Sequence, residues 1–171
     1  MLALDFSSDG SKIVTGSADR VTYLLDARTG KTEKRLEGHS HHVLAVGFAP
    51  DSKSVATAGA DRVIRIWDLE SGEPKNLRGH EGPVTSVRFT ADGKRVLSTS
   101  GDGTARLWNA GNKNAEATFG EAKGYLQAGT IYSGGKRFAT GAEDGSVRVY
   151  DLEKRKLLFE GARQSTSAGR P

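Results

Sequence analysis

The sequence predicts an all-β protein built from four copies of one four-stranded antiparallel unit, and three repeating features carry this prediction. Glycines recur at a step of 41 residues, at Gly38, Gly79, Gly120 and Gly161. Aspartates that suit tight turns keep nearly the same step, at Asp19, Asp61, Asp102 and Asp144. An aromatic or apolar residue followed by Asp or Asn recurs at Leu25-Asp26, Trp67-Asp68, Trp108-Asn109 and Tyr150-Asp151. A fixed period of about 40 residues indicates one supersecondary unit repeated along the chain.

The second copy shows the strands of the unit most clearly. Short runs rich in β-branched and aromatic residues occupy 43–48, 54–58 and 63–67, and turn residues separate them. Such runs are typical of antiparallel strands rather than helices. A fourth strand is predicted near Pro74 to Arg78. Both alternating sides of the run 63–67 are largely apolar, so we expect neighbouring sheets to cover both faces of this sheet.

The other three copies repeat this plan. Their predicted strands lie at 2–6, 13–17 and 21–25 in copy one, at 84–89, 96–99 and 105–108 in copy three, and at 125–132, 138–141, 147–150 and 156–160 in copy four. The four units are therefore expected to span 1–37, 38–78, 79–119 and 120–160. Residues 161–171 lack periodicity and carry few apolar side chains, so we expect a disordered C-terminal tail there.

Gly-His at Gly38-His39 and Gly79-His80, in register with Trp67-Asp68, resembles the WD40 family of β-propellers, and the resemblance covers about residues 1–160. It implies WD40-type blades, each four-stranded, arranged radially around a central channel. It also implies a structural hydrogen-bond network in each blade, which links the Gly-His histidine, a Ser or Thr of the second strand, the turn Asp and the Trp. Mapped onto this chain, the network residues are His39, Thr57, Asp61 and Trp67 in copy two, His80, Ser98, Asp102 and Trp108 in copy three, Thr15 and Asp19 in copy one, and Thr140 and Asp144 in copy four.

The outer copies depart from this pattern. Copy four has Glu121 in place of the His and Tyr150 in place of the Trp, while copy one has Leu25 at the Trp position and no corresponding His. We therefore expect the outer copies to be less rigid. A Ser or Thr, a His and an Asp also make up catalytic triads, but the same trio recurs in successive units, which favours a structural role. We predict no catalytic residue, and the chain is not expected to be an enzyme.

Ring closure is left open by the sequence, because four units of this type are few for one closed ring. The start at the first strand favours a segment of a longer propeller with missing upstream blades. Alternatively, two copies could pair as a dimer that forms an eight-bladed ring, or the chain could form an open arc or a strained four-bladed ring. An open arc would expose an apolar flank at each end, so we expect association in solution.

Binding is expected at the loops, which a rigid frame holds in place. The end of the blades that carries the turns between second and third strands is the predicted site for a protein or peptide partner. The candidate residues at this end are Arg20, His41, His42, Arg62, Glu81, Lys123 and Glu143. The resulting interpretation is a non-catalytic protein–protein interaction scaffold. Two alternatives remain: a basic surface that binds nucleic acid or anionic lipid, and one lobe of a larger multidomain protein whose chemistry lies elsewhere.

Composition narrows these options. The net charge is +4, and cations on the opposite end alternate with acidic residues, so nucleic acid is not the expected partner. The chain has no cysteine, and His41 and His42 lack a second ligand pair at a recognisable spacing, so no metal site and no cofactor are expected. No apolar stretch approaches the roughly 20 residues of a membrane-spanning helix. The first residues do not read as a signal peptide, and a cytoplasmic location is expected.

Overall fold

The computed structural model describes residues 1–120, 124–132 and 134–161. Within these residues the chain forms sixteen strands and no helix. The strands make four four-stranded antiparallel sheets, and each sheet contains four strands that are consecutive in the chain. These observations confirm the predicted all-β class with four four-stranded units, which are called blades 1 to 4 below.

The strands of each blade have the following bounds. Blade 1 contains β1 (Ala3–Phe6), β2 (Lys12–Gly16), β3 (Val21–Asp26) and β4 (Thr32–Glu37). Blade 2 contains β5 (Val43–Phe48), β6 (Ser54–Gly59), β7 (Ile64–Asp68) and β8 (Pro74–Leu77). Blade 3 contains β9 (Val84–Phe89), β10 (Arg95–Ser100), β11 (Ala105–Asn109) and β12 (Ala115–Phe119). Blade 4 contains β13 (Leu126–Ile131), β14 (Arg137–Ala142), β15 (Val147–Asp151) and β16 (Lys156–Gly161).

Short turns join the first two strands of the blades, and an aspartate closes this turn in blades 1, 2 and 3. In blade 3, the Asp92 Oδ1 atom accepts hydrogen bonds from the Thr90 hydroxyl (2.6 Å) and the Lys94 N–H (3.0 Å). The next residue, Gly93, has a φ of 70°, a left-handed conformation that glycine adopts without strain. Gly10 and Gly135 have nearly the same φ in blades 1 and 4. Blade 2 uses Ser52 (φ 58°) at the position of these glycines, so a left-handed residue occurs in this turn in all four blades.

Each blade has two distinct faces, and the strand register assigns side chains to them. In blade 2, Val46, Thr57 and Arg65 lie opposite one another on adjacent strands, as do Phe48, Val55 and Trp67. This set forms the preceding face, which points toward blade 1. The residues of the alternate positions form the following face, which points toward blade 3; they are Ala45, Ala56, Ala58, Ile64, Ile66 and Leu77.

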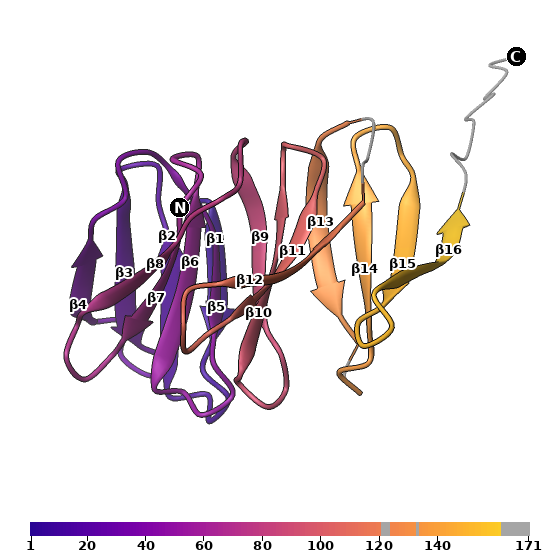
Figure 1. Cartoon of the computed structure of the whole chain (residues 1–171). Helices are drawn as coiled ribbons and strands as arrows, with labels where there is room; N and C mark the ends of the chain where they lie inside the picture. The colour runs from indigo at the N-terminus through magenta and orange to yellow at the C-terminus, as the bar shows by residue number, and fades with distance from the viewer. Residues whose placement is uncertain (121–123, 133, 162–171) are drawn as a thin grey trace, which may run out of the picture.

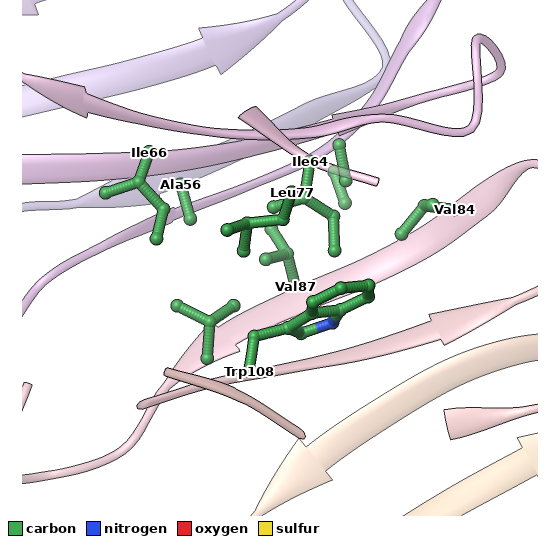
Figure 2. Close-up of a cluster of buried hydrophobic side chains, with 10 residues drawn as sticks. Ala56, Ile64, Ile66, Leu77, Val84, Val87 and Trp108 are labelled. Carbon is green, nitrogen blue, oxygen red and sulfur yellow. The ribbon is translucent and has the colours of Figure 1, made fainter. Parts of the chain in front are cut away.

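The hydrophobic core lies between blades rather than inside one of them. Figure 2 shows Trp108 and Val87 of blade 3 against Ile64 and Leu77 of blade 2. Ile64 and Val87 are fully buried, and Trp108 is 1% exposed. A similar cluster joins Val14 and Leu24 to the preceding face of blade 2, and another joins Leu97 and Phe119 to Phe138 and Tyr150 of blade 4. Each blade therefore buries its apolar faces only by stacking against its neighbours.

The two end faces of this stack are uncovered. The blades follow one another in chain order, with blade 4 at the right-hand end of Figure 1, and the four sheets do not close into a ring. On the preceding face of blade 1, Leu4 is 51% exposed and Phe6 is 54% exposed. On the following face of blade 4, Val147 is 47% exposed and Phe159 is 59% exposed. The structure is thus an open arc of blades with an apolar flank at each end.

The expected C-terminal tail lies mostly outside the described residues, at 162–171. Gly161, which sequence reasoning assigned to the tail, is instead the last residue of β16 and pairs with Val147. The predicted boundary was wrong by this residue, because the segment from 161 onward was assigned to the tail for its lack of periodicity and of apolar side chains. The residue pairs because β16 keeps antiparallel register with β15 to its end.

Ile64→Ala is expected to destabilise the protein by about 2–5 kcal/mol, because it removes a fully buried side chain from the core between blades 2 and 3. Chemical denaturation followed by tryptophan fluorescence would measure this loss, since Trp108 belongs to the same cluster. The exposed Lys53→Ala variant is the control and should unfold like the parent. Equal stability of the Ile64→Ala variant and the parent would contradict a core shared between blades.

Candidate functional site

A chain of hydrogen bonds crosses blade 2 from its core to its surface loop. The Trp67 Nε1–H donates to the Thr57 hydroxyl (2.8 Å), and that hydroxyl lies 2.8 Å from the His39 Nε2 atom. The His39 Nδ1 atom lies 3.0 Å from both carboxylate oxygens of Asp61. All four side chains therefore form one continuous network, as the resemblance implied. Thr57 is fully buried and His39 is 6% exposed, so the network replaces water for polar groups inside the stack.

Arg65 belongs to the same network, and sequence reasoning missed its role. Its guanidinium donates to the Asp61 Oδ2 atom (3.0 Å) and to the backbone carbonyl of Gly38 (2.8 Å). The side chain also lies against His39 and is only 7% exposed. Because an Arg recurs in the third strand four residues after each turn Asp of copies two to four, the spacing could have indicated an ion pair. The predicted network did not include this arginine.

Blade 3 contains the same network with different hydrogen-bond donors around its aspartate. The Trp108 Nε1–H donates to the Ser98 hydroxyl (2.8 Å), which lies 2.7 Å from His80 Nε2. Since the indole N–H can only donate, the Ser98 proton is free to be donated to His80 Nε2. His80 is then neutral and donates its Nδ1–H to Asp102 (2.8 Å). The Thr104 hydroxyl donates to Asp102 Oδ1 (2.7 Å), a side-chain donor that blade 2 lacks because Val63 stands at the equivalent position.

The environment of these groups lowers the pKa values of both aspartates and of His80, so each group favours its deprotonated form. Burial alone would raise the pKa of Asp102, but hydrogen bonds from Thr104 and His80 outweigh it and hold the pKa well below its ordinary value. The pKa of Asp61 is lowered in the same way, with His39 as the main partner against the effect of burial. Burial lowers the pKa of His80 below its ordinary 6.5, and this effect exceeds the opposing influence of Asp102. The network is therefore built from ionised aspartates and a neutral His80.

The outer blades hold their turn aspartates by other means. In blade 1, Asp19 accepts hydrogen bonds from the Tyr23 hydroxyl (2.8 Å) and the Val21 N–H (3.0 Å). Tyr23 occupies the position of Arg65, so a phenol takes part where an arginine does in blade 2. Thr15 lies on the open preceding face of blade 1, beside the row that contains Leu25.

Blade 4 keeps part of the pattern. Thr140 is 3% exposed, and the Asp144 Oδ1 atom accepts the Ser146 N–H (2.9 Å). Tyr150, at the Trp position, stacks on Phe138 with ring centroids 4.9 Å apart. By strand register Phe138 is equivalent to Val55, so an aromatic pair in blade 4 replaces the pair of Val55 and Trp67 in blade 2. Glu121, which stands at the His position in the sequence, lies outside the described residues.

The network fixes the loops at one end of the blades, here called the entry rim because the first strand of each blade starts there. In blade 2, the Ser40 N–H donates to Asp61 Oδ2 (3.1 Å) and the Ala60 N–H donates to the His42 carbonyl (2.9 Å). In blade 3, the Glu81 N–H donates to Asp102 Oδ2 (3.0 Å). The loop before each first strand is thus tied to the turn after each second strand.

The structure places the candidate binding residues on this rim, with their side chains in solvent. Arg20 and Arg62 have positive φ values of 75° and 66° at the equivalent turn position of blades 1 and 2. His41 and His42 form one exposed pair with ring centroids 4.4 Å apart. Glu143 of blade 4 is exposed, and its N–H donates to the Tyr125 carbonyl (2.8 Å). The remaining two are Glu81, which is exposed in blade 3, and Lys123, which lies outside the described residues.

No metal-binding arrangement is found among the described residues, where no three His, Asp or Glu side chains gather in a suitable group. Over the same residues, no helix could span a membrane.

The hydroxyl, imidazole and carboxylate groups that resemble a catalytic trio bond to one another inside the stack of blades, where Thr57 and Ser98 are both 0% exposed. In the geometry of the folded protein these hydroxyls cannot reach a substrate in solution.

Thr57→Val is expected to destabilise the protein by about 2–4 kcal/mol, because it keeps the shape but leaves Trp67 Nε1 and His39 Nε2 without their shared partner. The matched control is Thr15→Val, at the same register position of blade 1, where the face is open. Chemical denaturation would compare the two variants. Similar losses in both would show that the bridging hydroxyl has no special importance.

Acidification is expected to destabilise the protein in two steps. His80 has a lowered pKa in the folded state, so as pH falls below 6.5 the unfolded chain takes up a proton that the folded protein resists, and stability decreases. The lowered pKa of Asp102 contributes stability above its ordinary 3.8 that is lost as pH falls below that value. Thermal unfolding between pH 8 and 5 would follow the first step. The His80→Gln variant should show a weaker pH dependence in that range, and an unchanged slope would contradict the assignment.

The comparisons with known proteins agree with this geometry. Four stretches of the chain match the family described as WD domain, G-beta repeat, at residues 1–26, 30–68, 72–109 and 128–151. A comparison with curated proteins found no match. The matched stretches cover more than half of the chain and include the turn aspartates and the Trp-Asp pairs of the network. The chain therefore belongs to the WD40 family of WD domain, G-beta repeats.

Proposed function

We propose that this chain is a non-catalytic scaffold that binds a protein or peptide partner through its entry rim. Repeats of the WD40 family generally mediate protein–protein interactions. The observation that carries the proposal for this chain is the attachment of the rim loops to the buried networks of blades 2 and 3. Loops held in one conformation lose little conformational entropy when they bind, which favours specific recognition.

The rim presents a distinct set of side chains on this rigid frame. Over blades 1 and 2 it carries Arg20, Arg62 and the pair His41 and His42, all exposed. The loops of these two blades are joined directly, because the Val43 N–H donates to the Ser17 carbonyl (3.0 Å). A partner segment with acidic side chains over blades 1 and 2 would match this distribution. Long-range attraction of opposite charges would also speed its association.

The burial of the networks supports a non-catalytic role. A catalytic hydroxyl must reach its substrate, yet the Thr57 and Ser98 hydroxyls are enclosed between blades and already engaged with Trp and His side chains. Their histidines are each 6% exposed. The same arrangement occurs in two successive blades, which a support for the fold requires and a single reaction centre does not.

The opposite rim supports a protein partner over a nucleic acid. Several of its cations are engaged within the protein: Lys12 pairs with Glu33, Arg95 pairs with Glu116 (3.4 Å), and Lys34 donates to the Leu69 carbonyl. A nucleic-acid surface usually needs a concentrated stripe of free cations. Here the acidic partners on the same rim reduce the field that phosphates would meet.

A peptide selection would test the proposal. A random peptide library displayed on phage would be panned against the 171-residue chain, and fluorescence polarisation would measure the affinity of each selected peptide. Arg62→Asn combined with His41→Ala is expected to weaken binding about tenfold or more. Asn is chosen because it tolerates the positive φ at position 62. The matched control, Lys53→Ala on the opposite rim, should bind like the parent.

Two results would contradict this function. Selected peptides whose affinity is unchanged by the rim substitutions, or falls with Lys53→Ala, would place binding elsewhere. A labelled single-stranded oligonucleotide, or vesicles of anionic lipid, that bound more tightly than every selected peptide and were released steeply by added salt would favour the basic-surface alternative.

A further inference from the structure

The exposed large hydrophobic side chains of the described residues occur only on the outer blades. Those of blade 1 are Met1, Leu2, Leu4 and Phe6, and those of blade 4 are Tyr132, Val147, Leu157, Leu158 and Phe159. Blades 2 and 3 contribute none to this set. Soluble proteins rarely leave such contiguous apolar patches uncovered. The two end faces of the arc are therefore the surfaces that most require a partner.

We propose that a second copy of this chain covers both end faces. The following face of blade 4 in one copy packs on the preceding face of blade 1 in the other, in the register of the interior blade contacts. This inference does not depend on the proposed rim function, because the end faces and the rim are different surfaces. Three positions at which side-chain sizes are matched across the interior contacts support it, and the two open faces continue the same matching.

The first matched position pairs a residue of the second strand with one in the first strand of the next blade. Gly16 lies against Val46, since a Cβ atom added to the glycine would be 3.2 Å from the valine. Ala58 belongs to the same buried cluster as Val87, and Thr99 fills the space above Gly129. By strand register these pairs are equivalent to one another, and the corresponding open positions are Gly141 and Leu4.

This position gives the clearest evidence for complementarity. From blade 1 to blade 3, the side chain on the following face becomes larger, from Gly16 through Ala58 to Thr99. Over the same three contacts, the residue opposite it changes from valine to the smaller glycine. A Cβ atom added to Gly141 would meet nothing within 4 Å, so the space above it is empty. Leu4 is 51% exposed on the other open face. The smallest residue of the series thus remains for the largest partner.

The second matched position involves the aromatic end of the first strand. Phe48 shares a buried cluster with Val14, and Phe89 packs against the cluster that contains Ala56. The equivalent residues on the open faces are Phe6, which is 54% exposed, and Ala139. Ala139 lines an open, largely apolar groove of about 540 Å³ together with Thr130, Tyr132 and Val149. The Phe6 ring of a second copy would enter this groove as Phe89 approaches Ala56.

The third matched position lies at the outer edge of the blades. Lys34 of β4 reaches the Leu69 carbonyl of the next blade, and at the contact between blades 3 and 4 the equivalent residues are Ala117 and Leu152, which share a cluster. The open faces leave Phe159 in β16 and Ala27 after β3. At the contact between blades 3 and 4 a small alanine therefore faces a large leucine, whereas Lys34 and Leu69 meet through a hydrogen bond. The open faces offer an apolar pair of the first kind, the large Phe159 with the small Ala27.

Reciprocal contacts of this kind can close a ring. Each copy offers one face of each type, so two copies related by a twofold axis make the contact twice and leave no end face exposed. The product has eight blades from two four-bladed chains, which lies within the range of known propellers, roughly four to eight blades. For such a ring, the end face of blade 4 must be complementary to the end face of blade 1. Neither face needs to be complementary to a copy of itself.

Sedimentation velocity on the 171-residue chain tests the proposal. The parent is expected to sediment as a species of twice the 18.2 kDa chain mass at micromolar concentrations. Gly141→Leu should raise the dissociation constant of the dimer about tenfold or more, because it fills the space meant for Leu4. The variant should fold normally, since a Cβ atom at position 141 meets no atom within 4 Å and the position does not require a positive φ. Thr118→Leu, which places a leucine on an exposed strand of blade 3 outside the end faces, is the control and should dimerise like the parent.

A size exchange adds a second, independent readout. Leu4→Gly with Gly141→Thr reproduces the interior pair of Thr99 with Gly129, so the double variant should dimerise more tightly than either single variant. A monomeric parent at high micromolar concentration would overturn the proposal and would indicate that other blades cover these faces. Larger open assemblies would overturn ring closure by two copies. Dimerisation that Gly141→Leu leaves unchanged would place the contact elsewhere.

Discussion

The whole structure depends on one constraint: each blade is a sheet with apolar side chains on both faces, so no blade can bury its core alone. Ile64 and Trp67 illustrate this constraint, since they lie on opposite faces of the same strand and are both enclosed. Stacking in chain order satisfies it for every face except the first and the last. The repeat of the sequence, the position of the cores between blades and the two exposed flanks all follow from this single requirement.

The polar network solves a problem that this stacking creates. Short strands need tight turns, and a turn aspartate that closes such a turn must sit close to an interface that excludes water. In blade 3, the Ser98 hydroxyl accepts a hydrogen bond from the Trp108 indole and also lies within hydrogen-bond distance of His80. The buried polar groups of these three side chains therefore have hydrogen-bond partners inside the interface. The opposite end of the histidine meets the ionised aspartate at the surface loop. The network therefore couples the buried tryptophan to the conformation of the rim.

The repeat could be predicted from the sequence, but several side-chain pairs between strands and between blades could not. The periods of Gly, Asp and Trp-Asp were enough to predict four blades, and the resemblance assigned His39, Thr57, Asp61 and Trp67 to one network. The roles of Arg65 and Tyr23 were missed, because the same position carries an arginine that pairs with Asp61 in one blade and a phenol that bonds Asp19 in another. Size matching between Thr99 and Gly129 depends on the register of two blades and leaves no local signal in either strand.

The blade faces and the entry rim of this molecule are under different physical constraints. This difference determines which residues could give the proposed binding its specificity. A residue on a blade face is constrained by the size of the residue opposite it, so Gly129 is small because Thr99 is not. A residue on the entry rim, such as Arg62, has its backbone fixed while its side chain meets only solvent. If the proposed rim function holds, changes at the rim would alter recognition at little cost to the fold, whereas changes on a face would alter the packing of neighbouring blades. Binding at the rim and assembly through the flanks can consequently occur together on one molecule.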